Sequence, residues 1–87
     1  MSEFDSVCIQ HVYATNAYYS MQDAIKAMEA ATHFTWIAGH KELSSKIEED
    51  LDFYRRRSQE LADVLFKIGQ RKQELIEKDN ADKGRKN

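Results

Sequence analysis

The chain has 87 residues, which suffice for one domain and leave too little for a second hydrophobic core. Hydrophobic residues make up 41% and charged residues 32%, with three glycines and no proline, a balance that argues against a disordered tail and against most all-β folds. The formal net charge of −2 favours neither nucleic acid nor an anionic membrane as a partner. We therefore expect one helical domain that binds no membrane.

The single cysteine, Cys8, excludes an internal disulfide framework and is typical of a reducing compartment. No apolar run approaches the ~18–20 residues that cross a bilayer, and the N-terminus lacks the pattern of a secretory signal. These features together predict a cytoplasmic protein.

The charges divide the chain into two halves. Residues 1–40 contain one basic and four acidic residues, whereas residues 41–87 contain twelve basic and eleven acidic residues. A segment with few charges is usually buried on more than one side, and a charge-dense segment usually has one dry face. We expect the first half to have the larger buried surface.

The first predicted helix covers residues 15–36, approximately. Two stripes run along it at spacings of three and four: one holds Ala14, Tyr18, Met21, Ile25 and Met28, and the other holds Ala17, Ser20, Ala24, Ala27, Ala31 and Phe34. Gly39 is a plausible stop for this helix, followed by a short turn. Residues 7–13 alternate as a strand would, yet a lone strand has no visible partner, so helix or an irregular lead-in is favoured over a strand.

The second predicted helix covers residues 41–79, and the tail from 80 to 87 is polar and predicted to be frayed. Along this helix one series of positions recurs at alternating steps of four and three, the 3.5-residue period of a coiled coil. We call its apolar members the helix-2 seam: Ile47, Leu51, Tyr54, Leu61, Leu65, Ile68 and Leu75.

The fold class that follows is all-α: an antiparallel two-helix hairpin with a long second helix. With these boundaries the second helix is about 25 Å longer than the first. The surplus would leave Leu65, Ile68 and Leu75 exposed to water, which is unfavourable for apolar surface. We therefore predict that the chain forms a homodimer through the helix-2 seam, as a four-helix bundle or coiled coil. In the competing interpretation, the seam is reserved for a different protein.

Residue patterns for catalysis or for a metal site are weak. Glu29 and His33 share a helix face, but Gly39 is expected to end that helix before His40 comes into register with them. No orienting group accompanies Cys8 as a nucleophile. We therefore expect a protein that is not an enzyme and that uses neither a cofactor nor a metal.

Exposed aromatic and basic residues are the candidates for binding a partner protein. Tyrosine and tryptophan are common anchors of protein interfaces, and arginine is enriched there. The predicted partner-binding residues are Tyr18, Tyr19, His33, Trp36, Arg55, Arg56 and Arg57. On a helix the three arginines fan over about 200°, so they cannot form one stripe for phosphates, and nucleic acid is not favoured as a partner.

The run from Trp36 to Gly39 at the predicted turn resembles the WXG100 secretion substrates, which are also helical hairpins. In that family the turn is Trp-x-Gly, whereas two residues intervene here, and the C-terminal tyrosine-to-acid signal does not follow Asp79. The size and the lack of catalytic motifs are similar to those of small phage-encoded inhibitors of host or defence proteins, which would act in the host cytoplasm. Neither resemblance assigns a family.

The function predicted from these residues is a non-catalytic protein-binding module, an inhibitor or adaptor that occludes or bridges another protein. The first alternative is a structural or secretion-type hairpin in an obligate complex. The second is a weak nucleic-acid binder.

Overall fold

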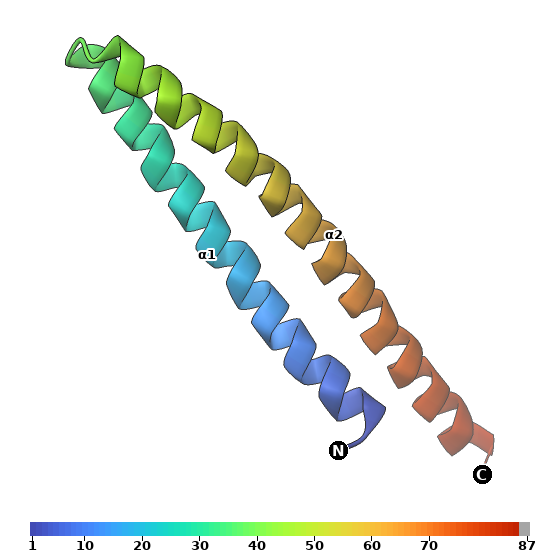
Figure 1. The fold of residues 1–87 in the computed structure, drawn as a ribbon. Coiled ribbons are helices and arrows are strands. Elements are labelled where there is room, and N and C mark those ends of the chain that lie inside the picture. The colour runs from blue at the N-terminus through green and yellow to red at the C-terminus, as the bar shows by residue number, and fades with distance from the viewer. Residues whose placement is uncertain (86–87) are drawn as a thin grey trace.

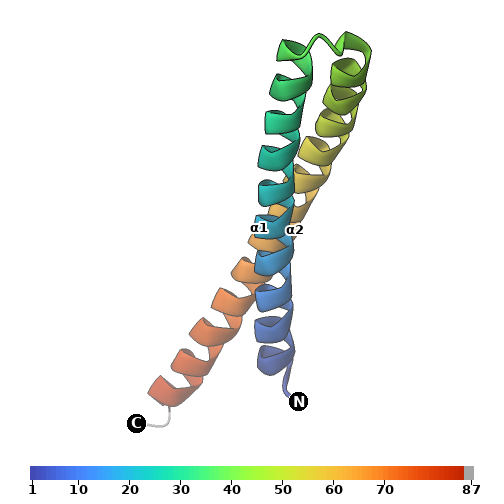
Figure 2. The ribbon, with the colours of Figure 1, turned by 90° about the vertical axis from the view of Figure 1, so that its left-hand side faces the viewer.

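Two long antiparallel helices joined by a tight turn make up the protein (Figure 1). The computed structural model describes residues 1–85, with α1 at Glu3–Ile37 and α2 at Lys41–Arg85. The helices form a rod of 71 × 18 × 16 Å, and Figure 2 shows them crossing at a shallow angle. The predicted all-α hairpin is confirmed.

A capping box starts α1 close to the N-terminus. The backbone N–H of Asp5 donates to Ser2 Oγ at 3.1 Å, and the backbone N–H of Ser2 donates to Asp5 Oδ2 at 3.3 Å. These bonds satisfy donors that a helix end otherwise leaves unpaired. The helix consequently begins at Glu3 rather than near Thr15 as predicted, and residues 7–13 are helical.

The turn between the helices depends on Gly39. Its φ of +84° lies in the left-handed region, which glycine adopts without the strain of a Cβ. The Gly39 N–H donates to the Trp36 carbonyl at 3.1 Å and the His40 N–H to the Thr35 carbonyl at 2.8 Å. This pair of bonds is the Schellman arrangement that ends a helix.

Glycine-to-alanine substitutions at Gly39 and Gly69 should change the free energy of unfolding in opposite directions. Gly39→Ala forces a side chain into the left-handed region and should lower the free energy of unfolding by about 1–2 kcal/mol. Gly69 lies inside α2 with open space around the Cβ position, so Gly69→Ala should raise it by up to about 1 kcal/mol. Urea denaturation followed by circular dichroism would measure both, and a destabilised Gly69→Ala would contradict the continuous helix.

The helix-2 seam lies on the face of α2 that packs against α1. Leu51 is buried at 3% exposure, and Ser58, in phase with it, accepts a hydrogen bond from Gln22 Nε2. Tyr54 is the most exposed member at 38%; the others are half-buried: Ile47, Leu61, Leu65, Ile68 and Leu75. The seam predicted to join two copies therefore contributes to the intramolecular helix pair.

The early start of α1 also reduces the length surplus of α2, because helices of 45 and 35 residues differ by about 15 Å rather than about 25 Å. The bond between Gln22 and Ser58 places these two residues at one level, so antiparallel helices put Leu65 level with Thr15. By the same count Ile68 lies level with Val12. The first turn of α1 is tied to α2 by Arg71, whose Nε donates to Glu3 Oε1 at 3.0 Å. The argument for a dimer from an unpaired end of α2 therefore fails.

The far end of α2 extends beyond the predicted boundary at Asp79. Residues 80–85, predicted to be a frayed tail, are helical, and residues 86–87 of that tail lie outside the described residues. Lys83 Nζ lies 3.0 Å from Asp79 Oδ2, an i,i+4 pair of the kind that supports an exposed helix. Arg71 of α2 donates hydrogen bonds to the side chains of Glu3 and Glu74. These bonds, with that to Glu3 the larger cause, raise the pKa of Arg71.

The hydrophobic core is small, and its end near the turn is polar. The buried apolar residues of the described chain are Val7, Ile25 and Leu51. Ser44, only 1% exposed, donates from Oγ to the Thr32 carbonyl at 3.2 Å, and Thr35 Oγ1 bonds the Ala31 carbonyl at 2.9 Å. Small buried residues let the helices approach closely near the turn. Because small polar residues occupy these buried positions, many of the large apolar side chains of the chain lie outside the core.

Neither helix, over the residues that the structure describes, has an apolar stretch long enough to cross a membrane.

Candidate functional site: the groove at the turn end

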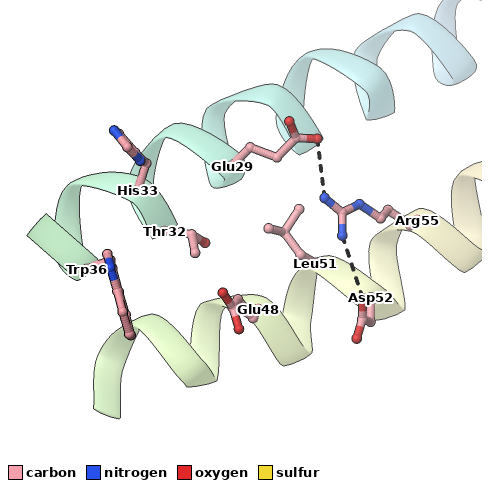
Figure 3. A pocket seen from close by; sticks show the side chains of 8 residues that line it. All are labelled: Glu29, Thr32, His33, Trp36, Glu48, Leu51, Asp52 and Arg55. Carbon is pink, nitrogen blue, oxygen red and sulfur yellow. Dashed lines mark ion pairs between the residues drawn. The ribbon is translucent and has the colours of Figure 1, made fainter. Parts of the chain in front are cut away.

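An open groove of about 590 Å³ lies along one side of the hairpin near the turn (Figure 3). Both helices contribute to it, and we call it the turn-end groove. Its lining residues are Glu29, Thr32, His33, Trp36, Glu48, Leu51, Asp52 and Arg55. The floor is formed where Leu51 of α2 points toward α1, and the walls are aromatic at one end and charged at the other.

Trp36 forms the aromatic end of the groove. It lies in the last turn of α1, where the Schellman bonds fix the backbone, and 60% of its surface is exposed. Its indole extends toward the start of α2, and Lys41 Nζ lies 5.9 Å from the ring centroid, within cation–π range. A large aromatic surface is thus held in a defined place and remains open to a ligand.

The other end of the groove is charged, with more carboxylates than cations. Arg55 bridges the helices, because its guanidinium lies 3.6 Å from Glu29 Oε1 and 3.6 Å from Asp52 Oδ1. Glu48 lies between this cluster and Trp36, and among the described residues no cation is within 4.0 Å of its carboxylate. The groove therefore has an unneutralised carboxylate beside its aromatic wall.

Three of the predicted partner-binding residues meet at this groove. Trp36 and Arg55 line it from opposite ends, and His33 lies at its rim with the imidazole directed away from α2 (Figure 3). Tyr18 and Tyr19 lie about 25 Å from Trp36 along α1. They contact each other edge to face, with ring centroids 5.5 Å apart. Tyr18 also lines a second hollow with Glu29 and Arg55, so it adjoins the charged end of the turn-end groove.

The three arginines diverge, as the helix period predicts. Arg55 is directed to the turn-end groove, whereas Arg57 lies over the Phe53 ring at 4.9 Å and pairs with Glu60 at 2.8 Å. Arg56, between them, is exposed. No continuous basic strip is formed by these three side chains, so their arrangement offers little to a phosphate backbone.

Within the described part of the chain, no group of three or more histidine, cysteine or acidic side chains is placed to hold a metal ion. Cys8 is half-buried and lines a shallow apolar hollow together with Ile9, Val12 and Tyr13.

The carboxylates of the groove were not among the predicted site residues. The sequence pattern singles out Glu29 only as a weak metal ligand, and it does not single out Glu48 or Asp52. Their spacing in the sequence could have indicated the groove. Glu48 and Arg55 are seven residues apart, and so are Glu29 and Trp36, so each pair lies on one flank of its helix. Two such flanks meet wherever two helices pack in register.

Comparisons with models of protein families, with curated protein sequences and with solved structures gave no match to this chain.

Proposed function

We propose that this chain is a non-catalytic protein-binding module, an inhibitor or adaptor that occludes or bridges a partner protein by means of the turn-end groove. The observation that carries the proposal is the position of Trp36, which is anchored in the helix-ending turn yet 60% exposed. Aromatic anchors of this kind supply much of the affinity at protein interfaces, because they bury a large area while losing few rotatable bonds.

The charges beside Trp36 indicate what chemistry the partner would offer. Glu48 has no described cation within ion-pair distance, and Glu29 and Asp52 share the single guanidinium of Arg55. A lysine or arginine of the partner would pair with Glu48 while its neighbouring apolar side chain covers the indole. The proposed ligand is therefore a protein segment in which a basic residue adjoins an apolar one.

Selection from a displayed random-peptide library against the immobilised chain would test this proposal. We expect enriched peptides to carry lysine or arginine next to an apolar residue. Trp36→Ala should weaken their binding about thirtyfold, the effect of losing a ~2 kcal/mol anchor. Glu48→Lys should abolish it by repulsion. Trp36 is the chain's one tryptophan, so its fluorescence reports binding to the wild type directly.

Tyr19→Ala is the matched control, because Tyr19 is equally exposed at 62% but lies far from the groove. Peptides that bind wild type, Trp36→Ala and Glu48→Lys with one affinity would show that the groove is not the binding surface. A selection that enriches acidic peptides would contradict the charge argument.

A further inference from the structure

The structure points to a second interaction surface, on another side of the hairpin from the turn-end groove. α1 has a stripe of exposed residues spaced alternately by four and three, and none of them is charged. The stripe consists of Tyr13, Ala17, Ser20, Ala24, Ala27, Ala31 and Phe34. We call it the outer stripe. It has a large aromatic at each end and small side chains between them, and Tyr13 and Phe34 are 71% and 69% exposed.

An apolar hollow lies beside the outer stripe, between the two helices. Met21 borders it from α1, one turn from Ala17 and Ala24, and most of its wall comes from α2: Phe53, Tyr54, Leu61 and Val64, with Arg57 and Glu60. Its volume is about 470 Å³. The outer stripe and this hollow together form one apolar side of the rod.

The solvent-accessible surface of the chain is larger than that of a compact monomer of the same mass. The chain exposes 6783 Å². A compact monomer of its mass, 10.2 kDa, exposes about 5,300 Å². The excess is about 1,500 Å², and a stable protein interface removes about 800 Å² from each partner. The excess is thus large enough for one interface of ordinary size.

We propose that the occupant of this side is a second copy of the same chain, with the two α1 helices packed antiparallel along their outer stripes. In that orientation the large side chains of one outer stripe lie opposite small side chains of the other. With Ala24 set opposite Ala27 of the second copy, Ala17 lies opposite Phe34 of the second copy, and Tyr13 opposite its Ala38. Each aromatic then packs over a small residue. A shift by one heptad in one direction would place Phe34 against the polar Gln10, and a shift in the other direction would carry Tyr13 beyond the end of α1 at Ile37.

The outer stripe faces the direction in which a helix of a four-helix bundle meets its second neighbouring helix. At 3.6 residues per turn, the stripe lies about 100° around α1 from the face that packs on α2. Two neighbours at about a right angle are what each helix of a square bundle has. The second copy would close the hollow at Met21, and it would leave the turn-end groove on the outside. The inference goes beyond the proposed function, since it holds whether or not that groove binds a peptide.

Light scattering from low to high micromolar protein tests the assembly. The wild type should have twice the 10.2 kDa mass of one chain, and Ala24→Glu should have the mass of one chain, because it introduces a charge where the stripes meet. Ala81→Glu is the control at an exposed position near the end of α2, away from the outer stripe of α1, and it should stay dimeric. Circular dichroism would check that each variant remains helical. A monomeric wild type, or a dimeric Ala24→Glu, would overturn the proposal.

Cysteine cross-linking tests the orientation in the intact chain with Cys8→Ser. Antiparallel pairing sets Ser20 opposite Ala31 of the second copy, and it separates the two copies of Ser20 by about 16 Å. An oxidised mixture of the Ser20→Cys and Ala31→Cys chains should therefore form a disulfide between the two variants. Neither variant alone should cross-link. Rapid cross-linking of Ser20→Cys with itself would show parallel pairing and contradict the proposed interface.

Discussion

Replacing Leu51 with alanine should lower the free energy of unfolding by about 2–5 kcal/mol, the range for truncating a buried leucine. Leu51 is 3% exposed and lies in a core whose other buried apolar residues, among those described, are Val7 and Ile25. A two-helix protein has few other contacts to compensate for the loss. We expect a large fall in the urea midpoint, followed by far-UV circular dichroism.

Leu43→Ala is the matched control, because Leu43 is on the same helix and 49% exposed. Its effect should stay below about 1 kcal/mol, since most of the removed surface is already in water. Equal destabilisation by the two substitutions would mean that the face of α2 marked by Leu51 is not the one buried in solution.

The helix pair could be predicted from the sequence because its period is regular. The spacing from Ile47 to Leu75 identified the inner face of α2, but it could not say whether α1 or another chain covers that face. The start of α1 decides this question. Its signal was the pairing of Ser2 with Asp5, an aspartate variant of the capping box that precedes an alternating run easily confused with a strand.

The site was predicted in part, for a reason of geometry. Trp36 and Arg55 were chosen as single exposed residues, and the structure brings them to one groove because the bond between Gln22 and Ser58 fixes the register of the two helices. Cross-helix register depends on the full length of both helices. The pairing of Arg55 with Glu29 was therefore beyond prediction while α1 was thought to start at Thr15.

The stripe of small residues shows how one sequence pattern can serve a purpose other than the first one considered. Small residues such as the alanines from 17 to 31 let two helix backbones approach closely where they lie between the helices. In the hairpin they are exposed, and the close approach to α2 uses Ser44, Ser58 and Thr35 instead. A helix with apolar or small residues on two sides is typical of one that has two neighbours. The hairpin supplies one of them.

Ser44→Leu should destabilise the hairpin and alter the groove together. Ser44 is 1% exposed and its Oγ donates to the carbonyl of Thr32, a residue that lines the groove. A leucine at this position would force the helices apart, at a cost of about 1–3 kcal/mol, and would remove that hydrogen bond. The indole of Trp36 lies one turn beyond Thr32, so its fluorescence maximum should shift. Ser45→Leu, at the exposed neighbouring position, should change neither the stability nor the fluorescence. A Ser44→Leu protein with wild-type stability and an unshifted maximum would show that the helices do not approach closely at the turn.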